Sequence, residues 1–229
     1  MTSENPAFEP SATSPSPQDE SGLKRILSAA PVYQAFQNLV GAQRLYRRLV
    51  REHIRPTPGL RVLDVGCGPA AILGELPDDV TYLGFDLSEL YIGAARKRWG
   101  TRGTFRCAPV NEVTVRDLPE VDVVLAVGVL HHLDDGDAER LFALAGSVLG
   151  AAGRVITYDP CFAPDQGALS RFLVSRDRGR HVRSPVGYET LARRTFPHVT
   201  ATVLEGHLRI PYTATVLSAS REPMSAADQ

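Results

Sequence analysis

Short apolar segments rich in β-branched residues alternate with amphipathic segments between Arg61 and Asp159. The strand-like segments are RVLDV, VTYLGFD, GTFRCA, VDVVLAVG and GRVITYD. Helix-like segments such as PAAILGEL, SELYIGAARKRWG and DAERLFALAGSVLG lie between them. This alternation predicts crossover connections and a mostly parallel sheet with helices on both faces. The sequence therefore predicts a doubly wound α/β fold.

The alternation stops after Asp159, where an Arg-rich segment runs from Ser170 to Ser184. A helix is expected to begin at Pro185, with Ser184 as its N-cap. Two last strand-like segments, HVTATVLEG and YTATVLSAS, have too few residues between them for a helical crossover. We therefore expect this final pair to be antiparallel.

The N-terminal part has a different composition. Residues 1–21 are rich in Pro and Ser and poor in large apolar groups, which predicts a disordered tail. Helical spacing from Pro31 predicts one broken helix or two short ones within residues 22–55, with the break near Gly41. Residues 56–222 are expected to form one catalytic domain, with a flexible C-terminus at 223–229.

The overall composition is ordinary for a globular protein, with 43% hydrophobic residues, 22% charged residues and a net charge of -1. It suggests neither a nucleic-acid partner nor a membrane partner. The N-terminus MTSENPAFEP lacks the features of a secretory signal, so a cytoplasmic location is expected. The three cysteines are widely spaced and predict neither a disulfide framework nor a metal site.

The segment VLDVGCGP contains a glycine loop. Gly66, Gly68 and Ala71 fit the pattern G-x-G-x-x-G/A, and Asp86 ends the next strand, as in a dinucleotide-binding fingerprint. Asp64, two residues before the first glycine, would repel a pyrophosphate but would favour an ammonium or sulfonium group. Both a nicotinamide-dependent oxidoreductase and a protein that binds a cationic cofactor are consistent with the loop.

Three motifs in order, VLDVGCGP, GFDLS and VGVLHHLDD, resemble those of class I S-adenosylmethionine-dependent methyltransferases. An N-terminal helix with Tyr33, Phe36, Gln37 and Leu39 to Ala42 is similar to that of a group of small bacterial methyltransferases. The resemblance runs from about Val32 to the C-terminus. It implies a Rossmann-like seven-stranded sheet of order 3-2-1-4-5-7-6, with strand 7 antiparallel and a helical lid.

The resemblance also implies S-adenosyl-L-methionine as the cofactor and S-adenosyl-L-homocysteine as the product. The loop from Asp64 to Gly68 would surround the methionine part, Asp86 would accept hydrogen bonds from the ribose, and Leu87 would contact the adenine. Many relatives carry an acid after the third strand; this chain does not, so apolar contacts such as Val110 would take its place. The expected cofactor-binding set is Tyr33, Gln37, Asp64, Gly66, Cys67, Gly68, Asp86, Leu87, Val110 and Val127.

Two histidines and an aspartate follow strands at the ligand-binding edge. His131 and His132 come after the fourth strand, and an ordinary imidazole pKa near 6.5 suits proton transfer. Asp159 ends the fifth strand, where it would serve as a base or hold a substrate amine or hydroxyl. All three are candidate catalytic residues. A structural role, in which a histidine caps the turn or Asp159 shapes the bend before Pro160, is the alternative.

The candidate substrate-binding residues are Tyr158, Arg180, His181 and Tyr212. An Arg pair in the Arg-rich segment would clamp a carboxylate or phosphate, although such charge runs are often only solvated. The sequence thus predicts a monomeric or homodimeric methyltransferase acting on a small, anionic molecule in bacterial secondary or specialised metabolism, with oxygen favoured over nitrogen or carbon as acceptor. The alternatives are a non-catalytic S-adenosylmethionine-binding protein and a nicotinamide-dependent oxidoreductase.

Overall fold

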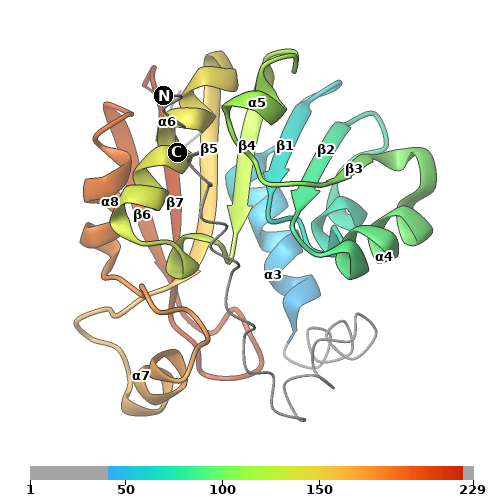
Figure 1. Ribbon diagram of the computed structural model, residues 1–229. Helices are drawn as coiled ribbons and strands as arrows, with labels where there is room; N and C mark the ends of the chain where they lie inside the picture. Colours follow the sequence, from blue (N-terminus) through green and yellow to red (C-terminus); the bar gives the residue numbers. More distant parts are fainter. Residues whose placement is uncertain (1–40, 224–229) are drawn as a thin grey trace, which may run out of the picture.

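The computed structural model describes residues 41–223 of the chain. Its centre is a seven-stranded sheet of order β3-β2-β1-β4-β5-β7-β6 (Figure 1). The strands are β1 Arg61–Val65, β2 Thr81–Asp86, β3 Thr104–Cys107, β4 Val121–Val127, β5 Leu149–Pro160, β6 His198–Leu204 and β7 Ala214–Ser220. Strands β1 to β5 are parallel, and β7 is antiparallel to both β5 and β6. The predicted strand order and the reversed seventh strand are confirmed.

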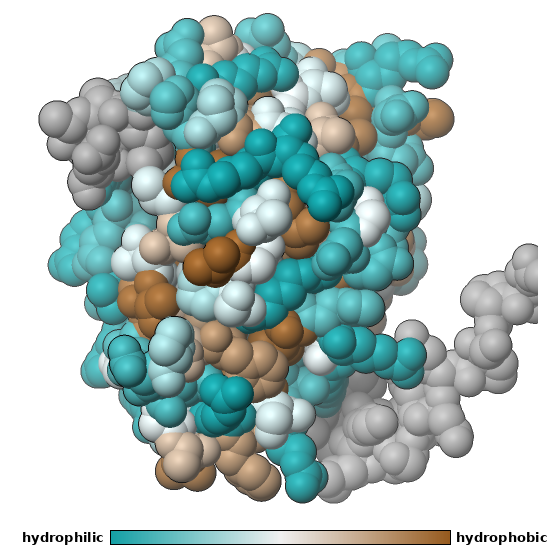
Figure 2. Space-filling view, turned by 90° about the vertical axis from the view of Figure 1, so that its left-hand side faces the viewer, coloured by the Kyte–Doolittle hydropathy of each residue, from teal (hydrophilic) through white to brown (hydrophobic). Residues whose placement is uncertain are grey.

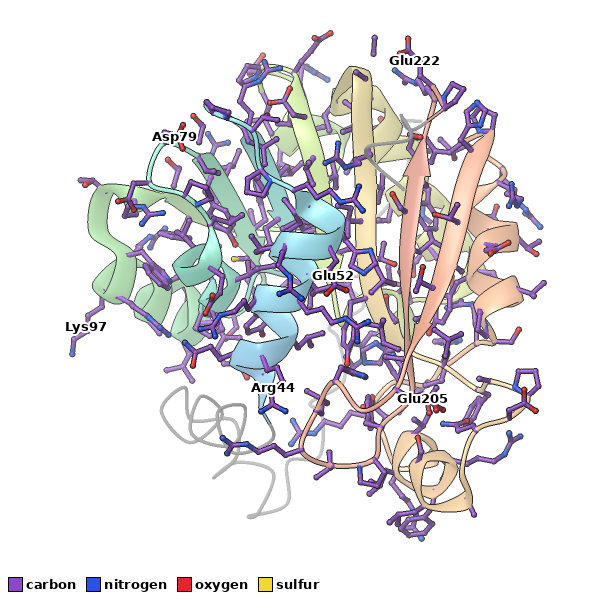
Figure 3. All side chains as sticks on the ribbon, turned by 180° about the vertical axis from the view of Figure 1, so that it is seen from behind. Arg44, Glu52, Asp79, Lys97, Glu205 and Glu222 are labelled. Carbon is purple, nitrogen blue, oxygen red and sulfur yellow. The ribbon has the colours of Figure 1, made fainter. Side chains whose placement is uncertain are left out.

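Helices cover both faces of the sheet. The helices and single turns are α3 Ala42–Arg48, η1 Leu49–Ile54, η2 Ala71–Glu75, α4 Glu89–Trp99, η3 Gly100–Arg102, α5 Glu112–Val115, η4 Leu130–His132, α6 Asp135–Val148, α7 Ala168–Ser175 and α8 Pro185–Ala192. One buried apolar cluster joins α3, η1, η2 and α4 to the sheet, and the other joins α5, α6 and α8 to the opposite face. Figure 3 shows α3 in front of the sheet when the molecule is seen from behind.

Several local predictions can be compared with the structure. The helix at Pro185 is confirmed, and the Ser184 hydroxyl accepts a hydrogen bond from the Gly187 N–H at 3.1 Å. The segment PAAILGEL forms only the short 3-10 helix η2, because Ala70 has a left-handed backbone at φ 53° and Pro77 follows closely. The helix α7, inside the Arg-rich segment, is an element that the sequence pattern did not predict.

The N-terminal predictions fall partly outside the described residues. Gly41, with φ 90°, directly precedes α3, but the residues before it lie outside the described part of the chain, so the break at this glycine stays a prediction. The tail 1–21, the rest of the lid and the C-terminal residues 224–229 lie outside the described part of the chain, as do Tyr33 and Gln37.

No helix within residues 41–223 is long and apolar enough to cross a membrane. Figure 2 shows the face that is on the left of Figure 1. Its described surface is mostly hydrophilic, and its apolar residues form small separate groups. On this face, therefore, no broad apolar area marks a contact with another protein.

Candidate active site

The parallel strands end at one edge of the sheet, the lower edge in Figure 1. The glycine loop follows β1 there, Asp86 ends β2, and the His pair follows β4. Figure 3 shows Arg44 of α3 and Glu205, after β6, at this same end, with Asp79 and Glu222 at the other. Ligands of open α/β sheets bind at the carboxyl ends of the strands, so this edge is the candidate active site.

The glycine loop has the backbone that its glycines predict. Gly66 and Gly68 have φ values of 70° and 53°, in the left-handed region that side chains disfavour. A Cβ on Gly66 would lie 2.7 Å from Cγ2 of Val129, so the loop is also packed closely against the turn after β4. The Cys67 side chain is buried toward Gly84 of β2, which leaves only the backbone of Cys67 for contact with a ligand.

Asp64 lies at the base of this loop and is buried. The Tyr82 hydroxyl donates a hydrogen bond to its Oδ2, whereas its Oδ1 has no partner in the described part of the chain. Burial raises the pKa of Asp64 to about 7, the Tyr82 hydrogen bond opposes the rise, and the charge of Asp86 adds to it. Since an unpaired buried acceptor is costly, Oδ1 fits a ligand that donates a hydrogen bond or carries a positive charge.

Asp86 holds the loop in place through its carboxylate. Its Oδ2 accepts from the Gly68 N–H at 2.9 Å and its Oδ1 from the Ser88 N–H at 2.8 Å. Each carboxylate oxygen can accept more than one hydrogen bond, so a ribose can still be bound. Leu87, next along the chain, is 75% exposed, so its side chain is accessible to a flat apolar ligand.

The other two expected cofactor contacts flank these residues. Val110 is half-buried and packs against the apolar cluster on the α6 face of the sheet. Val127, at the end of β4, is half-buried and packs against the cluster on the α3 face. The described residues of the cofactor set thus lie along one edge, and their donor and acceptor groups fit S-adenosylmethionine.

His131 and Asp159 are in direct contact. Asp159 Oδ1 accepts from the backbone N–H of His131 at 3.1 Å and lies 2.8 Å from its Nδ1. Both side chains are buried, and burial raises the pKa of Asp159, while hydrogen bonds from His131 oppose the rise. His131 is therefore fixed in place by β5.

A second carboxylate, Asp177, lies on the other side of the His131 ring. The distance from His131 Nε2 to Asp177 Oδ1 is 3.2 Å. The Tyr212 hydroxyl donates to Asp177 Oδ2 at 2.6 Å, so two predicted site residues, His131 and Tyr212, are joined through Asp177. Burial alone would lower the pKa of His131, but its hydrogen bonds to Asp159 and Asp177 outweigh it and raise the pKa to about 9.

His132 differs from its neighbour. It is exposed, and its ring centroid lies 4.0 Å from that of His131. Partial burial and the charge of His131 lower the pKa of His132, so this ring is neutral at neutral pH. Of the two histidines, His132 is the one whose ring can accept a proton from a ligand.

The arginines of the Arg-rich segment have different roles. Arg183 donates to Asp135 and to the carbonyls of Leu130 and Leu133, which holds the segment against η4. Arg180 is exposed, and the backbone N–H of His181 donates to the His131 carbonyl at 3.0 Å. Arg180 and His181, the two substrate-binding candidates of this segment, thus lie beside the His pair, and their role in substrate binding stays a prediction.

Tyr158 faces the opposite side of the sheet from Asp159. Its ring packs in the apolar cluster with α3, and its hydroxyl lies 2.6 Å from Nε2 of the buried His207. The structure therefore does not bring Tyr158 together with the His pair, and its substrate role stays a prediction.

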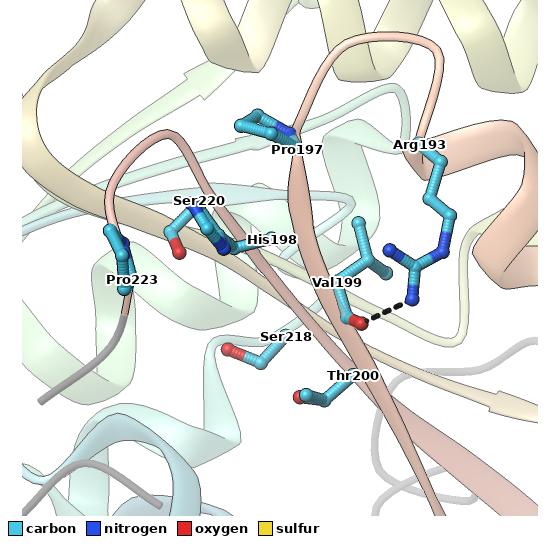
Figure 4. Close-up of a pocket in the computed structure, with 8 residues that line it drawn as sticks. All are labelled: Arg193, Pro197, His198, Val199, Thr200, Ser218, Ser220 and Pro223. Atoms are coloured by element: carbon cyan, nitrogen blue, oxygen red, sulfur yellow. Dashed lines mark hydrogen bonds between the residues drawn. The ribbon is translucent and has the colours of Figure 1, made fainter. Parts of the chain in front are cut away.

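Two pockets flank the sheet. The pocket in Figure 4, about 200 Å³ in volume, is lined by His198 and Ser220 among others. These residues start β6 and end β7, so the pocket lies at the edge opposite the candidate site. A larger pocket of about 550 Å³ lies between α3 and η2. Its charged lining residues are Arg44, Arg47, Glu75, Arg98 and Arg209.

Three contributors were missed by sequence reasoning. Tyr82 is the partner of Asp64, Arg183 holds η4, and Asp177 holds His131. A signal existed only for Asp177, as the single acid within the Arg-rich segment. The other two have no local pattern that distinguishes them from packing or surface residues.

Comparison with known proteins adds to this geometry. Residues 62–153 match the family model described as methyltransferase domain. This part of the chain is similar to a methyltransferase domain. The match covers β1 to the start of β5, including the glycine loop, Asp86 and the His pair. The match favours the methyltransferase interpretation of the glycine loop over the dinucleotide interpretation.

Relatives of the methyltransferase domain are distant in sequence. An uncharacterised 37.1 kDa protein in transposon TN4556 of Streptomyces fradiae is 27% identical over 82% of this chain and 54% of its own length. The ubiquinone biosynthesis O-methyltransferase of Bordetella avium is 28% identical over 59% of this chain and 58% of its own. The chain thus spans little more than half the length of these relatives.

The fold of the methyltransferase domain is also found in solved structures. The pyocyanin biosynthetic protein PhzM superimposes with a TM-score of 0.65 and 19% identity, over 86% of this chain and 60% of that one. At this identity the likeness shows a shared fold.

Proposed function

We propose that this chain transfers a methyl group from S-adenosylmethionine to an oxygen atom of a small, anionic molecule. The observation that carries the proposal is the buried Asp64 carboxylate, whose Oδ1 is unpartnered beside the glycine loop. A cationic ligand at this point would give the carboxylate a partner, whereas a phosphate would be repelled. The binding of a cationic cofactor follows from this.

The residues of the loop would hold the cofactor as follows. Asp64 would bind its ammonium group, Asp86 its ribose hydroxyls, and Leu87, Val110 and Val127 would contact its apolar parts. When bound, S-adenosylmethionine supplies an electrophilic methyl group on a sulfonium. The protein must align the acceptor with this group and exclude water.

An oxygen acceptor is favoured because a hydroxyl must lose its proton during the transfer, and a neutral imidazole is available. His132 is exposed and neutral at the candidate edge. His131 and Asp159 are already paired with each other, so they would act on the acceptor less directly. The name of the Bordetella avium relative, an O-methyltransferase, supports the same choice.

An anionic acceptor is supported by arginines in two places, a pocket on the α3 face of the sheet and the segment beside the His pair. Four arginines and one glutamate line the pocket between α3 and η2. Arg180 is exposed beside the His pair, where it would contact a carboxylate or phosphate. Action in bacterial specialised metabolism, in the cytoplasm and as a monomer or homodimer completes the proposal. The relationship to a pyocyanin biosynthetic protein supports the metabolic part.

Calorimetry on the full chain tests the cofactor site. We expect S-adenosylhomocysteine to bind and NADH not to bind. Asp64→Asn should weaken S-adenosylhomocysteine binding about tenfold or more, because a charged hydrogen bond is worth about 1.5 to 3 kcal/mol. Asp117→Asn, at an exposed acid away from the loop, is the matched control. Binding of NADH, or equal affinity of both variants, would contradict the proposal.

Transfer itself needs an acceptor. The full chain with radiolabelled methyl donor is screened against anionic phenols and hydroxy acids. Incorporation of label into an ether or ester is expected. Tight S-adenosylhomocysteine binding with no transfer to any acceptor would instead favour a non-catalytic cofactor-binding protein.

A further inference from the structure

The His131 ring lies between carboxylates that come from two separate segments of the chain. Its Nδ1 is 2.8 Å from Oδ1 of Asp159, and its Nε2 is 3.2 Å from Oδ1 of Asp177. An ionised carboxylate can only accept a hydrogen bond, so each ring nitrogen carries a proton when both acids are ionised. The arrangement is that of a fixed imidazolium, which has no free nitrogen to accept a proton.

Asp177 is itself held in place. Tyr212, just before β7, donates its hydroxyl to Asp177 Oδ2 at 2.6 Å, and the Gly179 N–H donates to Oδ1 at 2.9 Å. The backbone at Gly179 runs so close to His131 that a Cβ there would lie 2.1 Å from the ring carbon Cδ2. Asp177 is thus positioned from two sides, and the loop that carries it is packed onto the histidine.

The ring of His132 is close to this fixed cation, with the two ring planes tilted by 40°. The two ring centroids are 4.0 Å apart, and His132 is exposed whereas His131 is buried. The charged groups around His132 are His131, Asp177 and Arg178. If His132 took up a second ring proton, it would become a cation and would be repelled by the positive charge of His131. The neutral form of His132 is therefore favoured.

We propose that Asp177 and Tyr212 are positioning residues, which hold His131 as an imidazolium and so leave His132 as the proton acceptor of the transfer. This inference rests on the proposed function and deepens it. The acceptor hydroxyl gives its proton to His132 as its oxygen forms the bond to the methyl carbon. The electron pair of the broken carbon–sulfur bond stays on sulfur, and His132 later releases the proton to water.

The pKa directions agree with this geometry. The two carboxylates outweigh burial and raise the pKa of His131 to about 9. Burial and the His131 charge lower the pKa of His132. Burial alone would raise the pKa of Asp177, but hydrogen bonds from His131 and Tyr212 hold it well below its ordinary value.

The test is a titration of the imidazole rings by nuclear magnetic resonance on the isotopically labelled full chain, without ligand. In the unmodified protein we expect His131 to titrate well above His132, and His132 to titrate below the ordinary value of about 6.5. Asp177→Asn should lower the His131 titration point by about one unit or more, because one of two nearby carboxylates is lost. Tyr212→Phe should lower the His131 titration point by less, because the Asp177 carboxylate itself is kept. Asp165→Asn, at an exposed acid in the segment between β5 and α7, is the matched control and should not shift it.

A third variant addresses His132 directly. His131→Gln removes the positive charge, so the His132 titration point should rise toward its ordinary value. The proposal is overturned if His131 titrates below His132 in the unmodified protein, a measurement that needs no variant to fold. It is also overturned if Asp177→Asn and Asp165→Asn give the same His131 titration. Because the titration uses no ligand, failure of S-adenosylhomocysteine to bind would overturn the proposed function without changing the titration of either ring, so the two failures are distinguishable.

Discussion

The hydroxyl of Tyr82 on β2 donates a hydrogen bond to the carboxylate of Asp64 on the adjacent strand β1, and both side chains are buried. The strands are parallel, with Asp64 opposite Gly84. A residue of the sheet interior therefore favours the ionised form of Asp64, against the larger effect of burial, which raises its pKa. The same hydrogen bond therefore contributes to the stability of the sheet and holds the Asp64 carboxylate that would bind the cofactor.

Tyr82→Phe tests the strength of this link. It removes the donor but keeps the ring, so the free energy of unfolding at pH 8 should fall by about 1.5 to 3 kcal/mol, the range for hydrogen bonds to charged groups. The loss should be smaller at pH 5, where Asp64 is mostly protonated. Urea unfolding at both pH values measures it. An equal loss at pH 5 and pH 8 would show that the bond does not depend on the charge of Asp64.

Asp64→Asn should change how stability depends on pH. Burial raises the folded pKa of Asp64 to about 7, above its ordinary value of 3.8. Such a group binds more protons in the folded state, so its contribution to stability is full below about pH 4 and is lost as pH rises toward 7. Relative to the unmodified protein, the variant should therefore gain about 2 kcal/mol between pH 5 and pH 8. A stability difference that does not vary with pH would contradict the raised pKa.

Gly66→Ala and Gly68→Ala form a matched pair. Both glycines have positive φ, but only at Gly66 would the new Cβ collide with another residue, Val129 at 2.7 Å. Gly68→Ala should cost about 1 to 2 kcal/mol of backbone strain. Gly66→Ala should cost about 1 to 3 kcal/mol more because of overpacking. Thermal unfolding ranks the two variants, and the opposite ranking would mean that the loop and the turn after β4 are not in contact.

Gly179→Ala should loosen the loop that carries Asp177. The added Cβ would lie 2.6 Å from the His131 carbonyl oxygen as well as close to the ring, so the loop must move. We expect faster cleavage by a protease within residues 176–183 and a loss of stability of about 1 to 3 kcal/mol. Gly167→Ala, at the start of α7 with open space around it, is the control. Equal cleavage of both variants would show that the contact is not closely packed.

Arg183→Lys should destabilise the turn η4. The guanidinium donates to Asp135 through two nitrogens, at 2.9 and 2.7 Å, and also to backbone carbonyls. A lysine cannot reproduce this set of bonds, so a loss of about 1 to 3 kcal/mol is expected in urea unfolding. Arg178→Lys, at an exposed arginine, should stay within about 0.5 kcal/mol. A larger effect at Arg178 would contradict the assignment of Arg183 as the structural arginine.

The sheet could be predicted because its signals are local. Continuous apolar strands and amphipathic helices indicate a doubly wound fold, and the short connection before β7 indicates its reversed direction. The prediction of a regular helix after the glycine loop was wrong. Apolar spacing alone does not show that Ala70 takes a left-handed backbone conformation. It also does not show that the Trp99 ring lies against Gly74.

The candidate site could be predicted only where a motif marks it. Asp64, Asp86 and the His pair stand next to strand ends, so their types and spacing indicate their place. The contact of Asp177 with His131 joins residues in two different loops, and Tyr82 lies inside a strand. Such pairings depend on the three-dimensional course of the chain, which no local pattern encodes.

The reversed direction of β7 also affects how the protein is made. Because β7 is antiparallel to β5, the residues that precede it, including Tyr212, reach the edge where the parallel strands end. A ribosome synthesises His131 first, then Asp177, and Tyr212 only after β6. As domains fold during synthesis from the N-terminal side, the sheet from β1 to β5 can assemble before the last partner of Asp177 exists. The enclosure of His131 is therefore completed only after β6 has been synthesised, and a chain released before Tyr212 would retain the glycine loop but lack the partner that holds Asp177 at this edge.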